Sequence, residues 1–102
     1  MKLDDYQKGT LETWGGNSPK VRSVLGLSGE SGEVAECLKK HMRNDFTDDV
    51  YLEKLKKELG DVLFYVSVCA YEHGFTLSEV AQANYDKLQS RKQRGVIKGS
   101  GD

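Results

Sequence analysis

Three short breaks divide this chain of 102 residues into four stretches with helical periodicity. The breaks are Gly15-Gly16, the polar segment 44–49 and Gly74, and each contains residue types that commonly end or cap a helix. The chain has a single proline and no convincing alternation of apolar and polar residues. We therefore predict an all-α fold, with a four-helix bundle-like subunit.

The residues at these breaks also predict where the helices begin and end. We expect helices over about 3–14, 18–43, 50–73 and 76–93. Ser18-Pro19 is a typical opening of the second helix, and Thr76-Leu77-Ser78-Glu79 is a capping box for the fourth. The whole chain, 1–102, is predicted to be one domain, with a glycine-rich and mobile tail over about 94–102.

Composition limits the partners that the chain is expected to bind. Charged residues make up 30% of the chain and nearly balance, which leaves a formal net charge of −1. A protein that binds a nucleic acid backbone usually carries a basic surplus, so we expect no nucleic acid partner. No apolar run is long enough to span a bilayer, and the N-terminus lacks the apolar core of a signal peptide. We expect a cytoplasmic protein without a membrane partner.

The third helical stretch indicates self-association. It carries a regular apolar stripe that consists of Leu52, Leu55, Leu59, Val62, Val66 and Ala70. From 62 to 71 the sequence is apolar nearly all round, and one short chain can hardly cover every side of such a segment. We therefore expect a homodimer or homotetramer, with contacts that include Phe64, Tyr65, Val68 and Tyr71. The alternative is that this segment is fully buried within one subunit.

Two acidic pairs lie on consecutive predicted helices. Glu30 and Glu33 are three residues apart on the second helix, as are Glu58 and Asp61 on the third. This spacing places each pair on one helix face, beside an apolar stripe, so all four can meet where the helices pack. Such a group of carboxylates favours a hard divalent cation, and oxygen ligands suit Mg²⁺. The alternative is that both pairs lie on solvated helix faces.

Glycines inside the predicted helices add to this pattern. Gly26, Gly29 and Gly32 recur every third residue in the second helix, and Gly60 lies in the third. Each costs about 1 kcal/mol relative to alanine in a helix interior. We expect them to allow a close approach of the helices or to leave room for a ligand beside the carboxylates.

The segments GLSGESGEVAE (26–36) and KELGDVLFYV (57–66) closely resemble the MazG-like nucleotide pyrophosphohydrolases, which are all-α enzymes. The resemblance extends through ANYDKLQSRKQRG (83–95). It implies Mg²⁺-dependent hydrolysis of (d)NTP to (d)NMP and pyrophosphate, as a clearance of unwanted nucleotides. It also implies that the catalytic, metal-binding carboxylates are Glu30, Glu33, Glu58 and Asp61. The family has two adjacent glutamates where this chain has Gly29 and Glu30, so one carboxylate is missing.

Substrate contacts are expected from the first and fourth helices. Asn84, Lys87 and Arg91 share one face of the fourth helix, and the resemblance implies that they contact phosphate or pyrophosphate. Basic residues near the end of a helix can instead simply complement its dipole. Gln7 and Trp14 could meet a nucleobase through a hydrogen bond and stacking, although Trp14 suits a core position equally well.

Other functions stay open on the sequence alone. The chain has neither a P-loop pattern nor a Ser-His-Asp or Cys-His arrangement that would indicate another catalytic chemistry. A related enzyme that acts on a single nucleotide such as dUTP would share the same carboxylates. From a different class, the chain could be a non-catalytic helical module that binds a nucleotide or dimerises.

Overall fold

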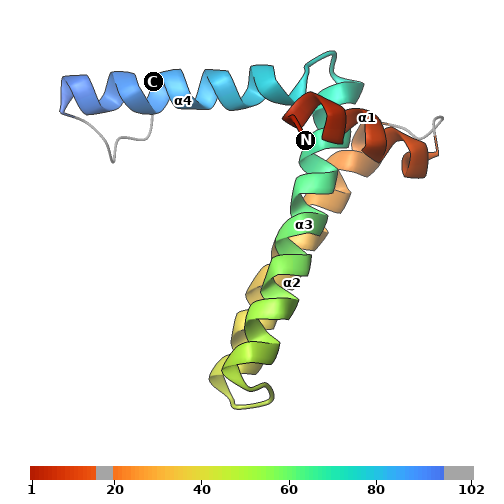
Figure 1. Cartoon of the computed structure of the whole chain (residues 1–102), viewed down its shortest axis with the longest axis vertical. Helices are drawn as coiled ribbons and strands as arrows, with labels where there is room; N and C mark the ends of the chain where they lie inside the picture. The colour runs from red at the N-terminus through yellow and green to blue at the C-terminus, as the bar shows by residue number, and fades with distance from the viewer. Residues whose placement is uncertain (16–19, 96–102) are drawn as a thin grey trace.

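The computed structural model describes residues 1–15 and 20–95, which form four helices (Figure 1). These are α1 (Leu3–Trp14), α2 (Lys20–Met42), α3 (Asp48–Glu72) and α4 (Leu77–Arg94). The described residues contain no strand, so the prediction of an all-α fold is confirmed. The predicted opening at Ser18-Pro19 and the glycine-rich tail beyond Gly95 lie outside the described residues.

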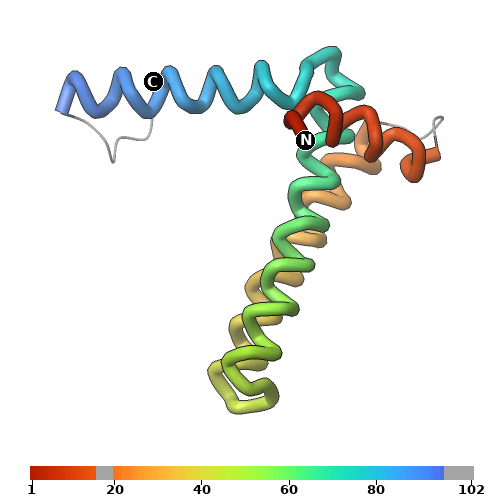
Figure 2. Tube along the Cα trace, in the orientation of Figure 1, coloured from red at the N-terminus to blue at the C-terminus, as the bar shows by residue number. Residues whose placement is uncertain are grey.

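The helices are arranged as a long arm with a crosspiece at one end. Helices α2 and α3 lie side by side along the arm and are joined by the loop 43–47 (Figures 1 and 2). Helix α1 packs on the end of α3, and α4 projects from the same end. Among the described residues, α4 contacts α1 and α3 but not α2. One subunit therefore does not close into a four-helix bundle, because its fourth helix does not lie along the other three.

The predicted helix boundaries follow local chemistry and are reproduced closely. Gly15 and Gly74 end α1 and α3 with positive φ angles of 70° and 84°, a region that suits glycine. The predicted capping box opens α4 with two reciprocal bonds. The Thr76 hydroxyl accepts from the Glu79 N–H at 3.1 Å, and the Glu79 carboxylate accepts from the Thr76 N–H at 3.1 Å. No described helix has the length and apolarity needed to cross a bilayer.

The apolar core lies at the junction of α1, α3 and α4. Val68 is completely buried there, and Trp14 contacts Phe64 and Tyr65 edge-on at centroid distances of 6.1 and 5.9 Å. The prediction that Val68 contacts another subunit is therefore wrong, because its own subunit encloses it. Tyr71 alone among the four predicted contact residues is mainly exposed, at 55%.

A network of polar contacts at the same junction connects three helices. The Gln7 side-chain amide donates to the carbonyls of Ser67 and Phe75 at 3.2 and 3.0 Å. Its oxygen accepts from the Leu77 N–H at 3.1 Å. The hydroxyls of Thr10 and Ser67 lie 3.0 Å apart. Gln7 thus satisfies backbone groups at the end of α3 and the start of α4, which sets the direction in which α4 leaves the junction.

The apolar stripe of α3 is covered only in part. Ala70 is buried, but Leu52 and Leu59 are 58% and 52% exposed, contrary to the prediction of a buried stripe. Helix α2 covers only one side of α3, and the apolar stripe of α3 is wider than that contact. Large apolar side chains are also exposed on α2 and α4, namely Val21, Val24, Leu25, Leu38, Val80, Tyr85 and Leu88.

Candidate metal centre

Three carboxylates meet where α2 packs against α3. Glu30 of α2 and Glu58 and Asp61 of α3 each place a carboxylate oxygen within 4.8 Å of the other two. Glu58 and Asp61 come together because they are three residues apart on one helix, and the antiparallel pairing brings Glu30 opposite them. Glu30 and Glu58 are half-buried, and Asp61 is exposed. The arrangement offers only oxygen ligands on the accessible side of the arm, which suits a hard divalent cation.

Repulsion among the carboxylates affects the pKa of Glu30. Burial raises the pKa of the Glu30 carboxyl above its usual value of 4.5, and the negative charges of Asp61, Glu58 and Glu33 raise that pKa further. A divalent cation would reverse the second effect, because it would attract the carboxylates that otherwise repel one another.

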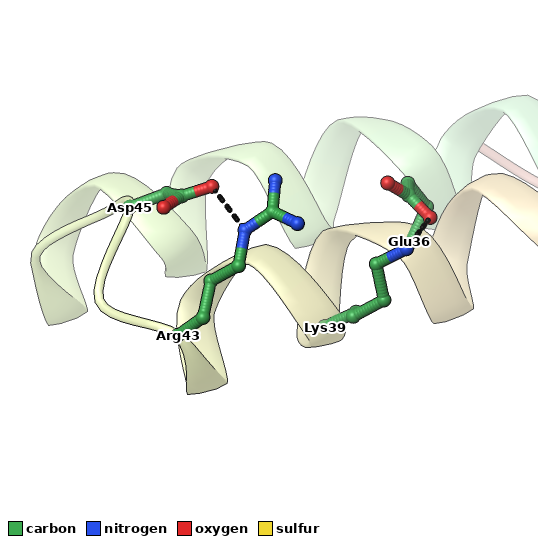
Figure 3. A network of polar contacts seen from close by, with 4 residues as sticks. All are labelled: Glu36, Lys39, Arg43 and Asp45. Atoms are coloured by element: carbon green, nitrogen blue, oxygen red, sulfur yellow. Dashed lines mark hydrogen bonds and ion pairs between the residues drawn. The ribbon is translucent and has the colours of Figure 1, made fainter.

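Glu33 lies one turn farther along α2 and does not belong to the three-way cluster. Its side chain is exposed, yet its charge contributes to the raised pKa of Glu30. Glu36 is half-buried and forms an ion pair with Lys39 at 3.3 Å (Figure 3). Figure 3 also shows the Arg43–Asp45 pair, at 2.7 Å, where the chain leaves α2.

A cavity of about 220 Å³ adjoins the carboxylates between α2 and α3. Its lining combines acidic and basic side chains with one aromatic ring and one thiol: Glu33, Glu36, Cys37, Lys40, Phe46, Lys54, Lys57 and Glu58. The lysines were missed in the sequence, because lysine on a helix usually indicates a solvated face. Their spacing carried a signal, since Lys40 lies seven residues after Glu33 and Lys54 four residues before Glu58.

Only one of the helix glycines permits a close contact. A Cβ atom on Gly26 would collide with the ring of Tyr65, so this glycine lets α3 approach α2. Gly29, Gly32 and Gly60 have nothing within 4 Å of the position where a Cβ would stand. The expected close approach therefore holds at Gly26, and the other positions face open space.

Tyr6 of α1 adjoins the acidic cluster and was not singled out in the sequence. Burial raises the pKa of its hydroxyl, and the nearby charge of Asp61 raises that pKa further. Tyr6 also lines a hollow of about 300 Å³ together with Gly9, Thr10 and Phe64. A tyrosine in an amphipathic helix gives no distinctive sequence signal, because such residues are common in cores.

The predicted substrate residues are not brought to the carboxylates within one subunit. Asn84 and Lys87 line an open hollow of about 730 Å³ along α4, and Arg91 lies one turn beyond Lys87. This helix points away from the arm that carries the acidic residues (Figure 1). Gln7 and Trp14 are only 6% and 5% exposed, so a nucleobase could reach neither without rearrangement of the junction. Trp14 also donates its indole N–H to Glu72 at 3.2 Å.

Comparison with known proteins identifies relatives of this chain. The sequence pattern of the MazG nucleotide pyrophosphohydrolase domain matches residues 21–96, which include all four predicted carboxylates. The chain is also similar to the Gene 37 protein of Mycobacterium phage L5. The two are 49% identical over 114 aligned positions that cover 100% of this chain and 98% of the phage protein. No solved structure gives a significant match.

Proposed function

Because the chain belongs to the MazG nucleotide pyrophosphohydrolase family, we propose that it hydrolyses nucleoside triphosphates to nucleoside monophosphates and pyrophosphate. The observation that carries this proposal is the convergence of Glu30, Glu58 and Asp61 within the matched region. The family and the acidic cluster both favour a divalent cation, and we propose Mg²⁺. Clearance of unwanted (d)NTPs would be the biological role.

The residues present fit Mg²⁺ in their chemistry. All three clustered side chains offer carboxylate oxygens, and their partial exposure leaves room for the water molecules that Mg²⁺ tends to retain. Bound there, the cation would supply positive charge to the phosphate oxygens and increase the acidity of a nearby water molecule. Glu30, Glu58 and Asp61 are therefore proposed to hold the cation and through it to orient the triphosphate.

The proposed reaction cleaves the bridge between the α- and β-phosphorus atoms. The oxygen of a water molecule bonds to one of these atoms, and the bond from that atom to the bridging oxygen breaks. The bridging oxygen retains the electron pair and leaves with the other phosphorus, which gives a monophosphate and pyrophosphate. We assign Glu33 to accept the proton of the water, because it borders the cluster without being part of it. The proton then passes to solvent.

We further propose that the protein works as a homo-oligomer, in which α4 of one copy reaches the carboxylates of another. Lys87, Asn84 and Arg91 would then contact the phosphates between subunits, as the family resemblance implies. Two observations support this arrangement. Helix α4 projects from its own subunit, and apolar side chains such as Leu88 (45% exposed) and Tyr85 (59% exposed) lie on its surface.

The decisive test of the function is the release of pyrophosphate from a panel of NTPs and dNTPs in the presence of Mg²⁺. We expect turnover that excess EDTA abolishes and Mg²⁺ restores. Full activity in EDTA would refute the metal mechanism. Nucleotide binding without any pyrophosphate release would instead support the non-catalytic module, and turnover of dUTP alone would identify a single-nucleotide enzyme.

A mixing experiment tests the subunit arrangement. Asp61→Ala and Lys87→Ala should each be inactive or nearly so. A mixture of the two should regain part of the activity, because some sites would combine an intact Asp61 with an intact Lys87 from the other chain. Sedimentation should show a species heavier than the 11.4 kDa monomer. A monomer at micromolar concentration, or a mixture without recovered activity, would contradict the proposal.

A further inference from the structure

The cavity between α2 and α3 changes character along its length. The end nearest the metal centre is acidic and includes Glu33 and Glu58. Toward the loop 43–47 the lining becomes basic, with Lys40 from α2 and Lys54 from α3. Lys57 also lines the cavity, adjacent in sequence to Glu58. The metal centre and a group of ammonium ions thus belong to one continuous surface of the same subunit.

The helix geometry places these ammonium ions within reach of a bound polyphosphate. Lys54 precedes Glu58 by four residues, which corresponds to about 6 Å along α3. Lys40 lies on the opposite wall, two turns beyond Glu33 along α2. Because the two helices run antiparallel, both steps lead in the same direction, away from the junction. A phosphate chain held at Glu58 by a cation could therefore extend toward lysines on both walls.

The local contacts leave the loop end of the cavity positively charged. Glu36 also lines the cavity, but its carboxylate is already paired with Lys39, which does not line it. The ammonium of Lys54 lies 5.0 Å from the centre of the Phe46 ring, a contact that holds the cation in place without neutralising it. A cation at the acidic end would offset Glu58. An anion is then the ligand that the remaining lysines attract.

Resting on the pyrophosphohydrolase function above, we propose that this cavity binds the β- and γ-phosphates of the substrate, and then the product pyrophosphate, through Lys40, Lys54 and Lys57. Its volume of about 220 Å³ suits a small anion. It lies below the range of about 300–1,000 Å³ that is usual for pockets that enclose drug-sized ligands. The nucleoside would consequently lie on the other side of the metal centre, toward α1 and Tyr6.

The competing interpretation is that the lysines only reduce repulsion among the carboxylates. In that case their loss would weaken Mg²⁺ binding and would affect every phosphate ligand alike. If the cavity binds pyrophosphate, their loss should weaken pyrophosphate binding and leave a monophosphate almost unaffected. The relative affinities for these two anions therefore separate the interpretations.

The test is calorimetric binding of pyrophosphate and of a nucleoside monophosphate, each with Mg²⁺, to the full chain and its variants. For Lys54→Gln or Lys57→Gln we expect the dissociation constant of pyrophosphate to rise about tenfold or more, from the loss of one charge-assisted contact. The monophosphate constant should change less than twofold. Lys56→Gln is the matched control, because Lys56 is exposed on the same helix and does not line the cavity.

Two further outcomes keep the proposal and the enzymatic function distinguishable. If pyrophosphate binds in a lysine-dependent manner but no NTP is hydrolysed, the cavity is supported and the function fails. If NTPs are hydrolysed while Lys54→Gln and Lys57→Gln bind pyrophosphate as the wild type does, the cavity proposal is overturned. The Lys54→Arg variant should bind pyrophosphate more tightly than Lys54→Gln, which would exclude a general loss of folding as the cause.

Discussion

The junction of α1, α3 and α4 and the arm formed by α2 and α3 have contrasting interiors. At the junction, Val68 and Ser67 are completely buried, and the Gln7 amide forms three hydrogen bonds with backbone groups. Along the arm, Cys37 is buried, but the other prominent groups are partly exposed carboxylates and lysines. The junction holds buried side chains such as Gln7, Thr10 and Ser67 that bond to one another and to the backbone, whereas the arm holds charges that attract a ligand.

This difference indicates that stability and chemistry reside in separate parts of the molecule. Changes at the junction should unfold the protein without altering the chemistry of the molecules that stay folded. Changes to the acidic residues of the arm should remove activity and leave the fold intact.

The largest expected effect is on activity, from Asp61→Ala or Glu58→Ala. Loss of one group that stabilises charge in the transition state reduces turnover by roughly 10²- to 10³-fold. Helical circular dichroism should stay nearly unchanged, and the metal-free protein should be at least as stable, because repulsion within the cluster is relieved. Glu53→Ala, an exposed position on the same helix, is the control. Wild-type turnover of both acidic variants would refute the site.

The second effect concerns the junction. Gln7→Ala leaves the Phe75 carbonyl and the Leu77 N–H without their side-chain partner, and it removes a second contact from the Ser67 carbonyl inside α3. A buried group left without a hydrogen bond costs about 1–3 kcal/mol, so the free energy of unfolding should fall by at least that amount. Denaturant titration measures the loss. Below the unfolding transition kcat should be retained, whereas lost activity with unchanged stability would favour nucleobase binding by Gln7.

A pair of glycine variants compares a crowded position with an open one on the same helix. Gly26→Ala forces a methyl group into the Tyr65 ring, and overpacking of this kind costs about 1–3 kcal/mol. Gly32→Ala meets open space and should stabilise the helix by up to about 1 kcal/mol. Thermal unfolding of the two variants gives the comparison. Equal shifts of the same sign would show that the close approach of α2 and α3 does not depend on Gly26.

The smallest effect is on the pH dependence of stability. The pKa of Glu30 is raised in the folded protein, so the folded state holds its proton more strongly than the unfolded chain does. Its contribution to stability is therefore complete below 4.5 and is lost as the pH rises through the raised pKa. Melting temperatures in EDTA should show this loss in the wild type. The Glu30→Gln variant should lack this component, and an identical pH profile for both proteins would contradict the assignment.

The sequence predicted local features well, because they depend on neighbouring residues. The capping box at Thr76 and the stop at Gly74 were both placed correctly. The packing of α3 was predicted less well. Periodicity showed that Val68 and Leu59 are on apolar faces, but it could not show that the junction would enclose Val68 and that no described helix would cover Leu59.

The site was predictable in part for the same reason. The acidic pairs stood out because each lies within a single helix, and three of their four members do meet. Glu33 falls outside that cluster, since its position depends on how the two helices are aligned. The spacing of the cavity lysines from Glu33 and Glu58 gave a weaker signal, because lysine on a helix usually indicates a solvated face. Lys40 and Lys54 come together only through the antiparallel pairing of α2 and α3, which sequence spacing within one helix cannot describe.

The direction of α4 has a consequence for the exchange of its amide protons with solvent. The 18 residues of α4 contact their own subunit where the helix leaves the junction, and most of the stability of a helix in a protein comes from tertiary packing. In the proposed oligomer, the distal turns would be protected by a neighbour. Their amide exchange should therefore accelerate on dilution, while the amide of Val68 should exchange at a rate that does not depend on concentration until the subunit itself unfolds.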